Sequence, residues 1–315
     1  MITRRDYLKL CAAAGVALAA GPARLLAAEE SKLPLTRVIP RSGEKLPVVG
    51  LGSSASFARI AGEGERTRIG EILQALLQQG GSVFDTAPSY GEAEAVAGEV
   101  AQAAGLQHRL FWATKLNVAG RGGGRADPAA ARAQLAQSLA RAGKAPVDLV
   151  QVHNMADVPT QLAILEEARD AGRIRYVGAT TTSAATYGDL ESLLETGRID
   201  FIGVDYAVDN RTMEERIFPL ARDQGVAVLV YQPFGRTRLW QRVEGHALPD
   251  WAAELGIATW AQFFLKFAIS HPAVTAATPA TSQVRNLVDN LGAALGPLPD
   301  DGARRRMVAH IESLA

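Results

Sequence analysis

Four side chains in the first half of the sequence could together perform acid–base chemistry: Asp85, Tyr90, Lys115 and His153. A free tyrosine has a pKa of about 10, so it is a weak acid at neutral pH unless its surroundings stabilise the phenolate. A lysine cation beside the phenol would provide that stabilisation, and a carboxylate would keep a buried lysine charged. A histidine could donate a hydrogen bond to the same substrate oxygen and fix its direction. Such a group could protonate an oxygen atom that gains negative charge during a reaction.

Each of these residues lies at or just beyond the end of a short apolar segment. Eight such segments of strand length occur, at residues 48–53, 82–87, 110–116, 148–154, 174–180, 200–207, 226–234 and 274–280. Amphipathic segments of helix length lie between or after them, at 65–80, 92–105, 128–143, 159–172, 186–197, 213–225, 249–269 and 282–295. Nearly continuous apolar strands are typical of parallel sheets buried on both faces. Six helices are expected to end at a glycine: Gly80, Gly105, Gly143, Gly172, Gly197 and Gly225.

This alternation predicts an α/β protein, specifically a (β/α)8 TIM barrel preceded by a β-hairpin within residues 36–48. The alternative is a doubly wound sheet, which would need a glycine-rich phosphate loop after its first strand. The sequence there, GLGSSASF at residues 50–57, is a poor match to G-x-G-x-x-G, so the barrel is favoured. The carboxyl ends of all barrel strands meet at one mouth, where the four side chains would converge.

The segment FDTAPSYG at residues 84–91 resembles the F-D-T-A-x-x-Y-G motif of the aldo-keto reductase superfamily. Lys115 in WATKL and His153 in DLVQVHN are similar in place and type to that family's lysine and histidine, and the resemblance covers roughly residues 36–295. It implies an NAD(P)H-dependent oxidoreductase that reduces an aldehyde or ketone by hydride transfer. Tyr90 would be the proton donor, Lys115 and Asp85 would tune it, and His153 would orient the carbonyl.

Each of the four residues also has a purely structural interpretation when it is taken alone. Asp85 could cap a helix, Lys115 could be a surface cation, His153 could be a core residue and Tyr90 could close a turn. Their combination on successive strand ends favours catalysis. Two alternatives stay open, a non-redox enzyme on the same barrel and a non-catalytic nucleotide-binding barrel.

The resemblance also implies where a nicotinamide cofactor would bind, NADP being the first choice and NAD the second. The cofactor would lie across the strand ends, with Tyr231 stacked under the nicotinamide, the loop 234–238 at the pyrophosphate, and Asn290 near the adenine. The predicted cofactor-binding residues are Gly52, Ser53, Asp85, Thr180, Thr181, Tyr231, Phe234, Gly235, Arg236, Arg238, Thr281, Arg285, Asp289 and Asn290.

Four positions depart from the family's pattern. Thr180-Thr181 replaces a common Ser-Asn pair, and Gly203 stands where strand six usually has a glutamine. Ala280 stands where many members have a lysine for the 2′-phosphate of NADP. Arg285, in the first turn of the following helix, is the candidate to supply that missing charge, and a solvated surface position is the equal alternative.

Composition limits the remaining partners. The formal net charge is zero, which gives no reason to expect a nucleic-acid partner, and the histidines show no ligand spacing that would indicate a metal site. The expected partner of the barrel is therefore a small carbonyl or alcohol substrate.

The amino terminus has the pattern of an export signal. Arg4-Arg5 precedes an apolar stretch from Leu10 to about Ala20, and this resembles a twin-arginine (Tat) signal peptide. We expect residues 1–28 to be the signal and 29–315 the barrel domain, with the Tat translocase as a partner during export, a periplasmic location and no stable membrane insertion after cleavage. Cys11, the only cysteine, lies within the signal, so the mature domain would contain no disulfide.

Overall fold

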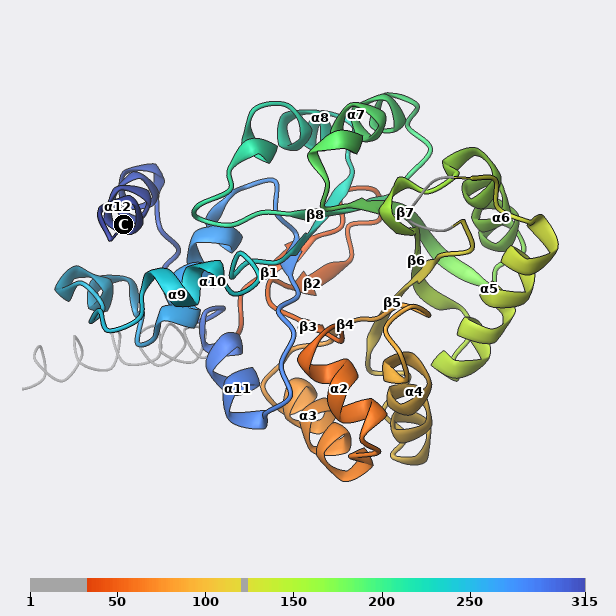
Figure 1. Ribbon diagram of the computed structural model, residues 1–315, viewed down its shortest axis with the longest axis horizontal. Coiled ribbons are helices and arrows are strands. Elements are labelled where there is room, and N and C mark those ends of the chain that lie inside the picture. The colour runs from red at the N-terminus through yellow and green to blue at the C-terminus, as the bar shows by residue number, and fades with distance from the viewer. Residues whose placement is uncertain (1–32, 120–123, 315) are drawn as a thin grey trace, which may run out of the picture.

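Eight parallel strands surround the centre of the computed structural model, which describes residues 33–119 and 124–314 (Figure 1). Their hydrogen-bonded order is β10-β9-β8-β7-β6-β5-β4-β3. Parallel bridges from Val49 to Ala277 and from Gly52 to Ala280 join the two ends of the sheet and close the barrel. The predicted (β/α)8 fold is confirmed.

The strands are short and follow the predicted apolar segments. They are β3 Leu51–Gly52, β4 Val83–Asp85, β5 Phe111–Leu116, β6 Val147–Val152, β7 Ile174–Thr181, β8 Phe201–Asp205, β9 Ala227–Tyr231 and β10 Ala276–Ala277. Because side chains alternate between the two faces of a strand, every second residue points into the barrel. Val83, Phe111, Leu149, Tyr176, Phe201, Leu229 and Ala276 belong to one buried cluster inside it.

Helices form the outer ring around the strands (Figure 1). They are α2 Ser56–Gly62, α3 Arg66–Gln78, α4 Ala93–Ala103, α5 Pro128–Ala142, α6 Val158–Asp170, α7 Tyr187–Glu195, α8 Ile217–Asp223, α9 Arg238–Arg242, α10 Trp260–Ser270, α11 Val284–Gly292 and α12 Asp301–Ser313. Short 3-10 helices are η1 His153–Met155, η2 Ala184–Thr186, η3 Thr212–Glu214 and η4 Asp250–Leu255. All six glycines predicted to end helices have positive φ, from 63° to 78°.

Two predicted helices are each divided in the structure. The segment 249–269 forms η4 and α10, because Gly256 adopts a φ of 63° and Thr259 begins a new helix by accepting a hydrogen bond from the Gln262 amide. The segment 213–225 likewise forms η3 and α8. The short helices α2 and α9 were not predicted.

The predicted hairpin is present as β1 Thr36–Val38 paired with β2 Lys45–Pro47. Ile39 and Leu46 of the hairpin are buried in the cluster inside the barrel. The Tyr176 hydroxyl, near the start of β7, donates to Ser42 Oγ at 2.7 Å. The hairpin therefore closes the end of the barrel where the strands begin, so the carboxyl ends of the strands form the open mouth.

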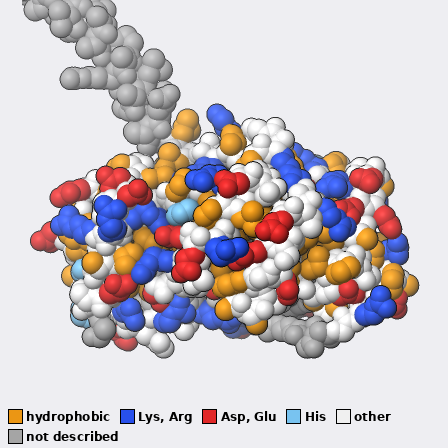
Figure 2. Space-filling view, turned by 90° about the horizontal axis from the view of Figure 1, so that it is seen from above, with side chains coloured by type: hydrophobic (Ala, Val, Ile, Leu, Met, Phe, Trp, Pro, Cys, Tyr) orange, Lys and Arg blue, Asp and Glu red, His pale blue; other side chains and the backbone are white. Residues whose placement is uncertain are grey.

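Acidic and basic side chains are interspersed over the face of the molecule in Figure 2. In the described part of the chain, no helix is long and apolar enough to cross a membrane. The predicted signal peptide, residues 1–28, lies outside the described residues.

Candidate active site

The four candidate catalytic residues lie on three successive strand ends. Asp85 is the last residue of β4, Lys115 is near the end of β5, and His153 directly follows β6. Tyr90 lies in the loop between β4 and α4. Lys115 is 1% exposed, Asp85 3% and His153 6%, whereas Tyr90 is only partly buried. The structure thus brings a phenol at the surface of the mouth together with a buried ion pair beneath it.

Lys115 and Asp85 form that ion pair. Lys115 Nζ donates to Asp85 Oδ1 at 2.7 Å and to the carbonyl oxygen of Thr86 at 2.9 Å. Burial opposes the ammonium charge, but Asp85 and then Tyr90 outweigh it and hold the pKa of Lys115 above its ordinary value. Burial raises the pKa of the Asp85 carboxyl, while Lys115 and a hydrogen bond from Tyr231 oppose that rise. A buried cation is therefore maintained at the floor of the mouth.

Tyr90 and His153 lie above this pair. Lys115 Nζ is 5.0 Å from the centre of the Tyr90 ring. The rings of Tyr90 and His153 are 5.9 Å apart with an interplanar angle of 80°, and Ser89 Oγ is 3.4 Å from His153 Nδ1. The arrangement places an acid, its neighbouring cation and an imidazole on one small region, as proton delivery to a single oxygen atom requires.

The segment after β6 holds His153 with an unusual backbone. Asn154, Met155 and Asp157 have positive φ, of 56°, 55° and 37°. This conformation is costly for residues other than glycine and is concentrated at functional sites in proteins. The Asn154 amide donates to Thr180 Oγ1 at 3.0 Å, so the end of β7 helps to fix the position of His153.

The residues predicted to surround the nicotinamide line the same mouth. Gly52 lies so close to β10 that a Cβ atom there would be 2.5 Å from the Thr278 carbonyl oxygen. Ser53 is fully buried, and its hydroxyl has no hydrogen-bond partner among the described residues. The Thr181 hydroxyl accepts from the Ser183 backbone amide at 3.1 Å, so both threonines at the end of β7 already accept hydrogen bonds from the backbone of the described chain.

The predicted pyrophosphate loop turns sharply after β9. Gly235 and Arg236 have φ of 56° and 61°, and the Arg236 side chain is exposed. Arg238, in contrast, donates to Asp209 at 2.9 Å. Phe234 is partly buried, with its ring 5.1 Å from that of Trp240. Arg236 is therefore the arginine of this loop that has no ion-pair partner in the described chain.

The segment predicted to bind the adenosine phosphate contains both engaged and exposed side chains. The Asp289 carboxylate accepts from the Thr259 hydroxyl and from the side-chain Nε2 of Gln262, each at 2.8 Å. Asn290 is buried, and Thr281 Oγ1 accepts from the Gln283 amide at 3.2 Å. Arg285 is exposed at the start of α11 and has no ion pair with any described residue. The Arg285 side chain is therefore in solvent, where a bound ligand could reach it.

Sequence reasoning missed Gln151 of β6. Gln151 is fully buried, and its amide donates to the Tyr231 hydroxyl at 3.0 Å. It lies two residues before His153, and the alternation of a strand puts both side chains on the interior face. A polar residue at that spacing in an apolar strand was the available signal.

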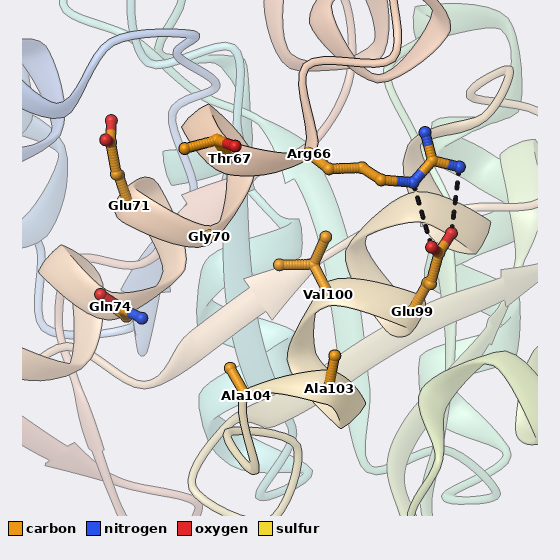
Figure 3. A pocket seen from close by; sticks show the side chains of 9 residues that line it. All are labelled: Arg66, Thr67, Gly70, Glu71, Gln74, Glu99, Val100, Ala103 and Ala104. Atoms are coloured by element: carbon orange, nitrogen blue, oxygen red, sulfur yellow. Dashed lines mark hydrogen bonds and ion pairs between the residues drawn. The ribbon is translucent and has the colours of Figure 1, made fainter.

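A groove of about 500 Å³ on the outer ring lies apart from this mouth. It runs between α3 and α4, where Gly70, Val100 and Ala104 form its floor and Arg66 pairs with Glu99 at one side (Figure 3). None of the candidate catalytic residues lines it.

The model of the aldo/keto reductase family matches residues 49–306 of this chain. The NADH-specific methylglyoxal reductase of Escherichia coli (strain K12) is 29% identical over 208 residues, covering 59% of this chain and 63% of that protein. Aldo-keto reductase YhdN of Bacillus subtilis (strain 168) is 28% identical over 202 residues, covering 61% of this chain and 60% of that protein. The chain thus matches less than two thirds of the length of either relative.

Solved structures share the fold. An aldo-keto reductase from Klebsiella pneumoniae, in complex with NADPH, superposes with a TM-score of 0.72 at 23% identity, over 90% of this chain and 95% of that chain. The holo form of AKR11C1 from Bacillus halodurans gives a TM-score of 0.70 at 22% identity, over 90% and 96%.

Proposed function

The chain belongs to the aldo/keto reductase family, and from this premise we propose that it reduces an aldehyde or ketone with a reduced nicotinamide cofactor. The observation that carries the proposal is the buried Lys115–Asp85 pair beside Tyr90, with the His153 ring facing the same region. A non-redox enzyme or a non-catalytic barrel would have no evident use for a phenol placed beside a buried cation.

The four side chains divide the work. When bound, the reduced nicotinamide supplies a hydride to the carbonyl carbon. His153 donates a hydrogen bond that orients the carbonyl oxygen, and Tyr90 transfers its phenolic proton to that oxygen, so the product is an alcohol. Lys115 stabilises the phenolate that remains, and Asp85 keeps Lys115 charged. The phenol then regains a proton from solvent, because Tyr90 is partly exposed.

The mouth has features that fit such a cofactor. Tyr231, at the end of β9, is partly buried and carries an aromatic ring that can lie against a flat nicotinamide. The buried Ser53 hydroxyl lacks a partner among the described residues, and a ligand amide could supply one. Arg236 and Arg285 are exposed cations that can meet phosphate oxygens. Thr180, Thr181, Phe234, Gly235 and Thr281 would form the walls, while Arg238, Asp289 and Asn290 would support them.

We propose NADP as the cofactor, with NAD as the second candidate. The NADPH complex of a structural neighbour supports the first choice, and the NADH-specific name of the E. coli relative supports the second. In this chain the difference depends on Arg285, since Ala280 offers no charge.

A direct assay tests the activity. The purified protein would be mixed with methylglyoxal or another test aldehyde and with NADPH or NADH, and loss of reduced-nicotinamide absorbance would be recorded. The proposal predicts turnover with at least one of the two cofactors. Absence of turnover with both, over a panel of aldehydes and ketones, would contradict it.

We further propose that residues 1–28 are a twin-arginine signal and that the barrel works in the periplasm. Tat translocation carries folded proteins, so the cofactor could be loaded in the cytoplasm and would stabilise the native state by mass action. Replacing Arg4 and Arg5 by lysine should leave the folded precursor in the cytoplasm with its cofactor. Periplasmic delivery of that variant at the normal rate would contradict the export proposal.

Coupling of cofactor loading to export needs its own variant. Tyr231→Ala combined with Gly235→Asp is designed to abolish nucleotide binding, and it should accumulate in the cytoplasm or be degraded. If it binds no nucleotide and still reaches the periplasm normally, loading is not coupled to export.

A further inference from the structure

Two glycines on neighbouring strands make room inside the barrel for two long side chains. A Cβ atom at Gly178 of β7 would be 3.0 Å from Cγ of Gln151. A Cβ atom at Gly203 of β8 would be 2.3 Å from the Tyr231 ring, closer than real Cβ contacts. The Gln151 side chain from β6 therefore passes over Gly178 of β7, the Tyr231 ring from β9 passes over Gly203 of β8, and the two side chains meet inside the barrel.

Their meeting point is the first link of a hydrogen-bond chain that ends at the catalytic ion pair. Gln151 Nε2 donates to the Tyr231 hydroxyl at 3.0 Å, and that hydroxyl donates to Asp85 Oδ2 at 2.9 Å. The other carboxylate oxygen, Oδ1, accepts from Lys115 at 2.7 Å. Both oxygens of Asp85 are thus engaged, one from each side.

Chemistry fixes the direction of this chain. A carboxylate only accepts hydrogen bonds, so the Tyr231 hydroxyl must donate its single hydrogen to Asp85. The Tyr231 oxygen can then take part in a further hydrogen bond only as an acceptor, and the side-chain amide of Gln151 provides the donor. Burial raises the pKa of the Tyr231 hydroxyl well above its usual range, so the hydroxyl stays a donor at working pH.

The Gln151 carbonyl indicates that this donor is needed. Gln151 Oε1 is buried and has no hydrogen-bond partner among the described residues. An unsatisfied buried carbonyl is costly, and an apolar side chain of the same size would avoid that cost. Gln151 places an amide in this apolar strand although only its NH₂ group has a partner among the described residues, which points to a requirement beyond packing.

We propose that Gln151 and Tyr231 are positioning residues that hold the Asp85 carboxylate in its place and charge state, so that Lys115 remains a cation beside Tyr90. The inference rests on the proposed function, in which Tyr90 is the acid. It adds a second role to the Tyr231 side chain, whose ring is predicted to contact the cofactor and whose hydroxyl contacts the acid's supporting carboxylate. Within the described chain, Lys115 Nζ faces Asp85 from β4, the ring of Tyr90 from the following loop and the ring of Tyr231 from β9, and His153 lies beside Tyr90.

The test measures the ionisation of Tyr90 and needs no turnover. Gln151→Met removes the donor with little change of volume, and Tyr231→Phe removes the hydroxyl alone. The parent protein and each variant would be titrated by tyrosinate absorbance, and so would the same proteins carrying Tyr90→Phe. The difference between the two titration curves of each pair is the ionisation of Tyr90. When the Gln151–Tyr231–Asp85 hydrogen bonds are broken, the positive charge of Lys115 is less well stabilised, and so is the Tyr90 phenolate. Ionisation of Tyr90 should therefore move to higher pH by about half a unit or more.

The assay of aldehyde reduction provides a second readout where turnover is found. In Gln151→Met the alkaline limb of the kcat/KM profile should shift in the same direction and kcat should fall by about tenfold, a modest loss for one link of an acid's support. Cofactor Kd should change by less than about threefold, because Gln151 does not line the mouth. Gly203→Ala should reproduce the shift, since its Cβ would displace the Tyr231 ring.

Ser138→Ala is the matched control. It deletes a buried hydrogen bond to Glu94, at 3.1 Å, between α4 and α5, so it should lower stability without moving the Tyr90 titration. An unchanged Tyr90 titration in both Gln151→Met and Tyr231→Phe would overturn the inference, whether or not reduction is detected. Absence of reduction in the parent, with the titration shifted as expected, would overturn the proposed function and leave the positioning role standing.

Discussion

Lys115 is the residue on which the charge balance of the mouth depends. It is 1% exposed, and its ammonium group is held by one carboxylate and one backbone carbonyl. Burying a cation is costly unless its partners are well placed, so loss of either partner should weaken the positive charge next to Tyr90. Single substitutions around Lys115 should therefore change catalysis more than they change the stability of the fold.

Lys115→Met should lower turnover by at least about tenfold, part of the 10²–10⁴ that a positioned acid contributes. It should also shift the alkaline limb of the pH–rate profile to higher pH, because the phenolate loses its neighbouring cation. Lys144→Met is the matched control, since Lys144 forms a similar pair with Asp148, at 2.6 Å, outside the mouth. Equal effects of the two substitutions on turnover would contradict the role of Lys115.

Arg285 gives the residue-scale prediction for the cofactor. Arg285→Ala should weaken NADP by about 1.5–3 kcal/mol, typical of a charge-assisted contact, and leave NAD unchanged. Calorimetric titration of both cofactors would measure this. If affinity falls equally for both, Arg285 does not distinguish them by the 2′-phosphate.

At the scale of elements, the barrel is built from short strands and from helices that end at defined residues. The eight strands and the six glycine helix ends were predictable, because apolar runs and C-terminal glycines are local signals. The division of the segment 249–269 was not predicted, since its apolar pattern continues past Gly256 while the backbone there turns left-handed. The four catalytic candidates could be named because they follow strand ends, whereas the Gln151–Tyr231 bridge depends on which side chains two distant glycines admit.

Thr259 tests the element that this division creates. Its hydroxyl accepts from the Gln262 amide and donates to Asp289, so it both caps α10 and ties it to α11. Thr259→Ala should lower the free energy of unfolding by about 1 kcal/mol, as measured in urea. Thr67→Ala, an exposed threonine of α3 with no side-chain hydrogen bond to a described residue, should change it by less than about 0.5 kcal/mol. Equal losses would contradict the capping role.

At the scale of the whole molecule, the first strand and the last helix both contact α10 or the segment that joins it to β10. Arg37 of β1 donates to the carbonyl oxygens of His271 and Val274, and Arg304 of α12 donates to that of Phe267 at 2.6 Å. His271 lies between these two arginines, and burial followed by Arg304 lowers its pKa to about 4. Its Nδ1 accepts from the Ala273 amide at 3.2 Å, which requires an unprotonated nitrogen there.

This arrangement predicts a loss of stability in mild acid. The unfolded chain binds a proton at His271 below pH about 6.5 and the folded chain does not, so stability falls as the pH drops from about 6.5 to 4. After allowance for partial exposure of the ring, the loss should be about 2 kcal/mol. His271→Asn keeps an acceptor for the Ala273 amide but cannot titrate, so its unfolding free energy should fall less over this range. Parallel pH curves for the two proteins would contradict the prediction.

The central claim, that Tyr90 protonates a carbonyl that receives a hydride from nicotinamide, is tested most directly by isotope transfer. The parent and Tyr90→Phe would each be given an aldehyde and a reduced cofactor deuterated at the transferring position, and the alcohol product would be analysed by mass. We predict deuterium at the former carbonyl carbon with the parent, and a rate lower by about 10²–10⁴ with Tyr90→Phe at little-changed cofactor affinity. Deuterated product formed at the same rate by both proteins, or product without deuterium, would contradict the account.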